Sequence, residues 1–438
     1  MLFALLSLPV VEVEEVVTTY VNPNNGSGPL WCYGASLLVR DGARLFVSAP
    51  ETGEGVAPLC NTRWQLFERT GDGWVRRQVG ERFEEREPCP LVRLRGGRLF
   101  LSTNPAIEQG ATHGPSRPTL LEFAARNPTT PPRVLDPVWA PDGVFTEHSY
   151  RGIAADRLTG EVLLLNINSP RPEYYWSLLD RDGKWSRQGK VAFPIRACYP
   201  EVALRNGSAH ILAIGDIVEP VKEWRDLKFE QTRNTWDYVF RRLFYTWTPD
   251  MGKQDFAEPV EVASVEATAG HISNLDLWLD GEGQAHLLFI QRNMQYGFLR
   301  DRFFPGQKMT TSLEWVTMEG SEVVARRTLL SYTEGEAGPV PVHARFHVAP
   351  GGRLYVVYYA GGQDEKGRSL AGDYLMQVLP EQSQPVRLDL KNPLSSFLTA
   401  TERGGTEPSN TLELFGIGAD PLTLRYARIR LRASASSG

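Results

Sequence analysis

Histidine, tyrosine, arginine and asparagine residues cluster in four short stretches of this sequence, each at the start of an apolar run. The stretches contain His148, Tyr150 and Arg151; Arg196 and Tyr199; His271 and Asn274; and His343 and Arg345. Three of the seven histidines therefore occupy matching positions in successive units of the chain. The match is closest for His148 and His271, because each precedes a turn glycine, Gly160 or Gly283, by the same interval.

These residue types suit β-elimination on a uronic-acid polymer. In that reaction a cation neutralises the sugar carboxylate, a base removes the proton at C5, and an acid protonates the leaving oxygen. The candidates are Arg196 or Arg345 as the cation, His148 or His271 as the base, and Tyr150 or Tyr199 as the acid. The residues expected to contact the substrate are Arg151, Asn274, His343, Arg345 and the aromatic platform Trp224.

Three other classes of function remain open from the residues alone. In a metal-dependent enzyme, the imidazoles of His148, His271 and His343 would hold one divalent ion, as catalytic zinc or non-haem iron requires. A glycoside hydrolase would need two carboxylates across the scissile bond, drawn from Glu147, Glu201 and Asp276. A protein that binds a glycan or a protein partner without turnover would need no reacting group.

The elements that position these residues are short strands in a repeating unit. An apolar strand, a Gly- or Asp-rich turn, a second apolar strand and one or two aromatic strands recur six times, with a weaker seventh copy after Phe397. Turns such as Asn206-Gly207 and Gly351-Gly352 supply the positive φ values of tight hairpins. The pattern predicts an all-β fold, a single seven-bladed β-propeller with four-stranded antiparallel blades, whose inner strands begin around one mouth.

The chain divides into three parts. Residues 22–432 form the predicted propeller, and residues 433–438 a disordered tail. In the segment 1–21, the apolar start is read either as the remnant of a secretory signal or as an ordinary N-terminus, and residues 11–21 as a closing strand for the last blade. A long insertion over residues 219–241, rich in Trp, Arg, Asp and Lys, is a candidate lid.

Charge and composition limit the classes of partner that this protein can bind. A net charge of −5 argues against nucleic acid, since phosphate binding requires a basic face. The longest apolar stretch is too short to span a bilayer, so no membrane anchor is expected. Four cysteines suit disulfides in an oxidising compartment, although buried free thiols explain them equally well. We expect a secreted or periplasmic monomer whose partner is a polysaccharide or oligosaccharide.

Two segments carry a resemblance to known propellers. The run Leu-Asp-Arg-Asp-Gly-Lys-Trp185 resembles a degenerate Asp-box turn of sialidase-type propellers. The stretches around His148 and Arg196 resemble BNR-repeat propellers that include the ulvan-lyase-type polysaccharide lyases. This resemblance, confined to residues 147–207, implies a secreted enzyme that cleaves acidic polysaccharides by elimination. It implies a catalytic role for His148, carboxylate neutralisation by Arg196 and a site tyrosine at Tyr199, while His113 and His271 compete for the second histidine.

Overall fold

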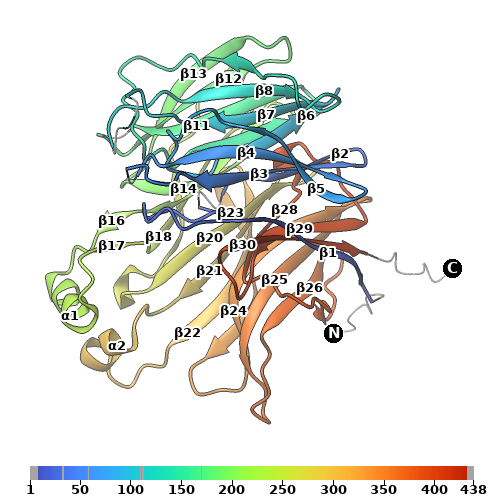
Figure 1. The fold of residues 1–438 in the computed structure, drawn as a ribbon. Helices are drawn as coiled ribbons and strands as arrows, with labels where there is room; N and C mark the ends of the chain where they lie inside the picture. Colours follow the sequence, from blue (N-terminus) through green and yellow to red (C-terminus); the bar gives the residue numbers. More distant parts are fainter. Residues whose placement is uncertain are drawn as a thin grey trace.

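Seven four-stranded antiparallel sheets are arranged as the blades of a ring (Figure 1). The computed structural model describes residues 8–31, 34–57, 59–108, 110, 113–168 and 170–431. The prediction of a seven-bladed all-β propeller is confirmed. The predicted signal remnant up to residue 7, Cys32 and the predicted tail at 433–438 lie outside the described residues.

The first six blades take their strands in chain order from the channel to the rim. Blade 1 has β2 (Leu38–Asp41), β3 (Arg44–Thr52), β4 (Thr62–Thr70) and β5 (Gly73–Val79), and blade 2 has β6 (Leu91–Leu94), β7 (Arg98–Thr103), β8 (Thr119–Ala124) and β9 (Arg133–Leu135). Blade 3 has β10 (Gly152–Asp156), β11 (Glu161–Asn168), β12 (Glu173–Leu179) and β13 (Trp185–Ala192). Blade 4 has β14 (Ala197–Arg205), β15 (Ser208–Gly215), β18 (Arg242–Thr248) and β19 (Val260–Ser264). Blade 5 has β20 (His271–Leu279), β21 (Ala285–Arg292), β22 (Thr310–Glu319) and β23 (Glu322–Thr333), and blade 6 has β24 (Gly338–Ala349), β25 (Arg353–Gln363), β26 (Gly372–Leu379) and β27 (Val386–Arg387).

Blade 7 is assembled from both ends of the sequence. It comprises β28 (Ser396–Thr399), β29 (Thr411–Ile417), β30 (Thr423–Arg430) and, on its outer edge, β1 (Val10–Thr19). β1 pairs antiparallel with β30, from Val10 opposite Arg430 to Thr19 opposite Thr423 (Figure 1). Because this blade joins distant parts of the chain, its backbone hydrogen bonds hold the ring closed.

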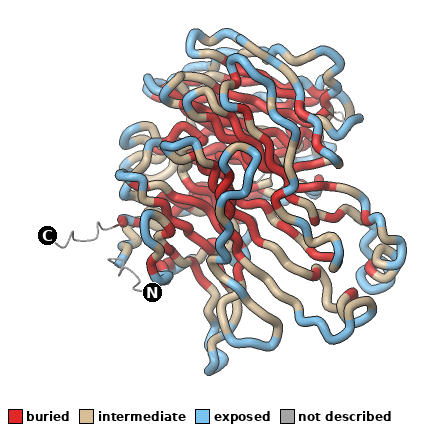
Figure 2. Tube along the Cα trace, turned by 180° about the vertical axis from the view of Figure 1, so that it is seen from behind, coloured by how far each residue is buried: buried red, intermediate tan, exposed pale blue. Residues whose placement is uncertain are grey.

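Tight turns and apolar strands explain why these segments form blades. Asn206 and Gly207 join β14 to β15 with φ values of 49° and 81°, the left-handed conformation that a two-residue hairpin requires. β11 is buried at every position after its first residue, because each blade packs both faces against its neighbours. Figure 2 shows the buried segments running through the body of the ring, with the exposed ones at its loops.

The insertion predicted as a lid folds as a helical excursion that the sequence pattern did not indicate. β16 (Ile217–Val218) leads to α1 (Lys222–Thr232), and β17 (Tyr238–Val239) returns the chain to blade 4. α1 packs beside α2 (Gly297–Phe303), an excursion of blade 5 (Figure 1). Two 3-10 turns complete the elements, η1 (Glu266–Thr268) and η2 (Glu402–Gly404). In the described part of the chain, no helix is both long and apolar enough to cross a membrane.

Candidate functional site

The inner strands of blades 4, 5 and 6 share an irregularity near the mouth of the channel. The pairing register shifts between Cys198 and Glu201 in β14, between Asn274 and Asp276 in β20, and between Pro341 and His343 in β24. A bulge changes which way the following side chains point. These irregularities therefore separate residues at the mouth from residues that face the interior of the channel.

Four of the predicted site residues meet in one cluster at the mouth, around Trp31. The His148 ring lies 4.1 Å from the Tyr150 ring and 5.3 Å from Trp31, measured between centroids. The Tyr150 and Tyr199 rings are 5.0 Å apart, and Trp31 Nε1 donates a hydrogen bond of 2.8 Å to Tyr199 Oη. The Arg196 guanidinium lies 5.2 Å from the Tyr150 centroid. Blades 3 and 4 thus bring an imidazole, a guanidinium and two phenols into contact with one another.

His148 is oriented by a buried carboxylate. Its Nδ1 lies 3.2 Å from Glu87 Oε1, and the backbone amide of Ser149 donates to the same oxygen at 3.0 Å. Burial by itself favours the protonated carboxyl, but hydrogen bonds and charge from His148, with help from Arg151 and Ser149, lower the pKa of Glu87 to about 2. An ionised carboxylate can only accept, so Nδ1 carries a proton, and in the neutral form of the ring the lone pair is on Nε2.

Arg196 is held by Asp216, with which it forms an ion pair, and its side chain remains 29% exposed. Its guanidinium also lies over the ring of Tyr238, 5.7 Å from the centroid. Burial raises the pKa of Tyr150, whose hydroxyl is hydrogen-bonded to Asp216. Tyr150 is thus a buried support for Arg196, and Tyr199 is the better placed of the two predicted acids.

Two arginines predicted to contact substrate lie instead inside the protein. Arg151 is 2% exposed and donates to Glu85 Oε2 at 3.1 Å, and Arg345 is 1% exposed and donates to the Phe397 carbonyl. Their position follows from the strands, which turn these side chains toward the channel filling and away from the mouth. The predicted roles of Arg151 in binding and of Arg345 in binding or as the cation are corrected accordingly.

The carboxylates considered for hydrolysis are also largely buried. Glu201 lies 3.9 Å from Arg345, and Asp276 pairs with Arg403 at 3.0 Å. Neither has more than 1% of its surface exposed. Glu147 lies nearer the mouth, where it accepts from the Gly114 amide at 2.9 Å. These carboxylates do not form a pair that faces a sugar across the channel.

His271, Asn274 and His343 line a separate cleft of about 320 Å³ that adjoins the His148 cluster. His271 Nε2 lies 3.2 Å from Ser273 Oγ, whereas His343 Nε2 donates to the Phe397 carbonyl at 2.7 Å. His148 instead contacts Glu87, Trp31 and Tyr150. Within the described residues, no group of three or more His, Cys, Asp or Glu side chains could hold a metal ion, so the predicted His148, His271 and His343 site is not formed.

Trp224 is not a platform of this cleft. It lies on α1, where its ring packs against Phe304 at 5.8 Å and the Arg241 guanidinium at 5.0 Å. The insertion instead supplies Phe240 to the cleft and an exposed Trp236 beside it. Its run of aromatic residues at positions 236, 238 and 240 was the sequence signal for this face.

Sequence reasoning also missed Glu87 and Asp216. Glu87 lies four residues before the inner strand of blade 2, and His148 lies four residues before the inner strand of blade 3. Reading that position in every blade would have identified it. Asp216 follows the second strand of blade 4, and nothing in the spacing of the sequence pairs it with Arg196. The described cysteines Cys60, Cys89 and Cys198 are buried, and no disulfide joins them.

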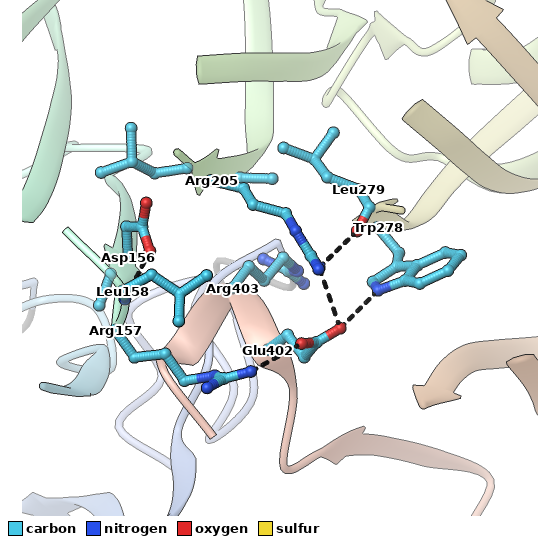
Figure 3. A pocket seen from close by; sticks show the side chains of 11 residues that line it. Asp156, Arg157, Leu158, Arg205, Trp278, Leu279, Glu402 and Arg403 are labelled. Carbon is cyan, nitrogen blue, oxygen red and sulfur yellow. Dashed lines mark hydrogen bonds and ion pairs between the residues drawn. The ribbon is translucent and has the colours of Figure 1, made fainter. Parts of the chain in front are cut away.

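At the opposite end of the inner strands, η2 contributes Glu402 and Arg403 to the lining of a small pocket (Figure 3). Glu402 accepts a hydrogen bond of 2.8 Å from Trp278 Nε1 and lies 3.5 Å from both Arg157 and Arg205. The remaining hollow is about 30 Å³, room for about one water molecule. The cleft of about 320 Å³ that is lined by Trp31, Tyr199 and His271 is therefore much the roomier of these two spaces.

Glu201 gives a testable pH dependence of stability. Burial raises the pKa of Glu201 to about 8, against the opposing charges of Arg345 and Arg403. Above pH 4.5, the usual pKa of glutamate, the unfolded chain releases the Glu201 proton while the folded protein keeps it. The contribution of Glu201 to the free energy of unfolding is therefore lost as pH rises from 4.5 to about 8. In urea unfolding across that range, Glu201→Gln is expected to show a shallower decline in the free energy of unfolding than the parent.

Glu365→Gln, on an exposed turn of blade 6, is the matched control and should follow the parent profile. If the Glu201→Gln and parent profiles run parallel, Glu201 is ionised in both the folded and the unfolded states.

Comparison with known proteins shows relatives at the level of fold. The chain is similar to the crystal structure of the polysaccharide lyase Uly1, with 9% identity over 91% of this chain and 90% of that one, at a TM-score of 0.51. It also matches the propeller domain of the Trilobed protease from Pyrococcus furiosus, with 7% identity over 92% and 99% of the two chains, at a TM-score of 0.45. An alpha-L-arabinanase of Penicillium chrysogenum matches with 12% identity over 78% and 92%, at a TM-score of 0.40. No protein-family model and no curated protein sequence matches this chain.

Proposed function

We propose that this propeller is a polysaccharide lyase that cleaves an acidic polysaccharide by β-elimination, acting outside the cytosol where such polymers occur. The observation that carries the proposal is the His148–Glu87 pair beside Arg196 and Tyr199. A base with a defined tautomer, a partly exposed cation and a phenol are the three groups that elimination needs.

The reaction assigns each group one step. Arg196 binds the C6 carboxylate and stabilises the negative charge that develops as the C5 proton leaves. His148 Nε2 takes that proton, the C5–H electron pair forms the C4–C5 double bond, and the C4–O bond breaks. Tyr199 gives its proton to the leaving oxygen, and the Trp31 N–H bonded to Tyr199 Oη stabilises the resulting phenolate.

The fold is compatible with this proposal. A polysaccharide lyase has been solved with the same ring of blades, so such a scaffold can carry elimination chemistry. At 9% identity the likeness says nothing about individual residues, and the assignment of roles rests on the contacts at the mouth.

The proposal is tested by following the ultraviolet absorbance of unsaturated uronic acid while the protein is incubated with a panel of uronic-acid polysaccharides. We expect an increase with at least one polymer. Arg196→Lys keeps the charge opposite Asp216 but loses the planar fork that binds a carboxylate with two hydrogen bonds. It should therefore lower kcat/KM by about 10-fold or more.

A folded protein that yields no unsaturated product from any polymer overturns the proposal. New reducing ends without unsaturation would indicate hydrolysis instead. Circular dichroism of Arg196→Lys serves as the control for folding.

A further inference from the structure

The cleft beside the His148 cluster is a distinct space with its own lining. It lies between the inner strands of blades 4, 5 and 6 and the return of the insertion, and its lining residues include Trp31, Tyr199, Phe240, His271, Ser273 and Asn274. Trp31 and Tyr199 belong to both spaces, and the Trp31 ring lies 5.3 Å from His148. A group bound in the cleft is therefore one ring away from the proposed base.

The lining of the cleft combines apolar side chains with a few hydrogen-bonding ones and contains no charged residue type. None of its described lining residues is Asp, Glu, Lys or Arg. Burial, with the nearby charges of Arg292 and Arg241, lowers the pKa of His271 to about 4, and burial with the charge of Arg345 lowers that of His343 to about 3. Arg241 is itself paired with Glu219. Both imidazoles are thus neutral at physiological pH. The two guanidiniums beside the rings of the mouth, Arg196 over Tyr150 and Arg86 over Trp31, are not among the lining residues.

Aromatic rings extend from the cleft to solvent. Phe240 lies 6.0 Å from Tyr199 and 5.8 Å from His271, measured between ring centroids. Trp236 lies 5.8 Å from Phe240 and is 51% exposed. An exposed tryptophan leading to a neutral, hydrogen-bonding cleft matches a pyranose ring, which has an apolar C–H face and uncharged hydroxyls.

We propose that the cleft, with Trp236 at its rim, is a subsite for an uncharged sugar, so that the preferred substrate alternates uronic acid with a neutral, unsulfated sugar. This inference rests on the proposed function, because it places the uronic acid on Arg196 and the neighbouring sugar in the cleft. A sulfate in the cleft would be desolvated without a cation among the lining residues, which is unfavourable.

The test measures binding by calorimetry with the His148→Gln variant, which prevents turnover. The probes are oligosaccharides in which uronic acid alternates with an amino sugar or a neutral sugar, and each is used in an unsulfated and a sulfated form. Examples are chondroitin, heparosan and desulfated ulvan, each compared with its sulfated counterpart. We expect the unsulfated member of at least one pair to bind about 10-fold or more tightly than its sulfated form.

Two substitutions added to this variant locate the binding. Trp236→Ala should weaken affinity by about 3- to 10-fold through loss of stacking, and Ser273→Ala by a similar factor through loss of a hydrogen bond. Phe229→Ala is the matched control, because Phe229 is a 43% exposed aromatic residue of the same insertion that does not line the cleft. It should leave affinity unchanged.

The inference and the proposed function can fail separately. If sulfated forms bind as well as unsulfated ones, or if Trp236→Ala and Ser273→Ala bind like the control, the subsite is wrong even where the parent protein shows elimination. If the two substitutions weaken binding while the parent yields no unsaturated product, the subsite is supported and the proposed elimination activity is refuted. Absence of binding to every probe overturns the subsite.

Discussion

Replacing Glu87 with glutamine is expected to lower kcat for elimination by about 100-fold or more, although Glu87 is buried and does not reach the mouth. The carboxylate accepts a hydrogen bond from the Nδ1–H group of His148, and this leaves Nε2 as the base. A glutamine amide can donate to Nδ1 instead, which would move the ring proton to Nε2. The base would then be present in the wrong tautomer.

His148→Ala is the reference variant, because it removes the base itself. It should lower kcat by about 100- to 10,000-fold. Because both substitutions remove one function, the double variant should be little worse than His148→Ala alone. Nitrogen-15 chemical shifts of the imidazole report the tautomer directly. Glu87→Gln that is folded, retains the Nδ1-protonated tautomer and turns over at the parent rate would show that Glu87 does not position the base.

The largest loss of stability is expected at Arg403, far from the proposed chemistry. Arg403 of η2 donates to Asp276 of blade 5 at 3.0 Å and to the carbonyl of Gly34 ahead of blade 1. Both side chains of the pair are almost fully buried. Arg403→Leu leaves the Asp276 charge without its cation, so we expect it to lower the free energy of unfolding by about 3–5 kcal/mol.

Urea unfolding followed by fluorescence measures this change. Adding Asp276→Asn should recover part of the stability, because the uncompensated charge is then gone. Lys222→Met removes one partner of an exposed ion pair with Asp226 and should have no measurable effect. If Arg403→Leu unfolds at the same urea concentration as Lys222→Met, the pair across the channel does not support the ring.

Much of the fold could be predicted because its signals are local. Asn206-Gly207 and Gly351-Gly352 adopt the positive φ values that such dipeptides favour, and each hairpin follows from residues within a few positions. The helical insertion escaped prediction because α1 spans 11 residues and contains polar side chains on most of its surface. It packs against α2, 65 or more residues away, and a contact at that separation cannot be read from the local sequence.

The candidate site could likewise be predicted only in part from local signals. The sequence by itself determined which segments form inner strands, because strand order and turn positions are encoded locally. His271 begins β20 and Arg196 directly precedes β14, as expected. His148 instead lies four residues before β10, and His343 is the sixth residue of β24. Only the tertiary structure decided that His148 and Arg196 share one cluster, that His271 and His343 line another space, and that Arg151 and Arg345 are buried. Side-chain direction in a strand alternates residue by residue, so a bulge or a residue with positive φ, such as Tyr150 or Tyr199, reverses it. Those irregularities, and partners such as Glu87 and Asp216, arise from contacts between blades and between separate strands, which the spacing of residues along the chain does not record.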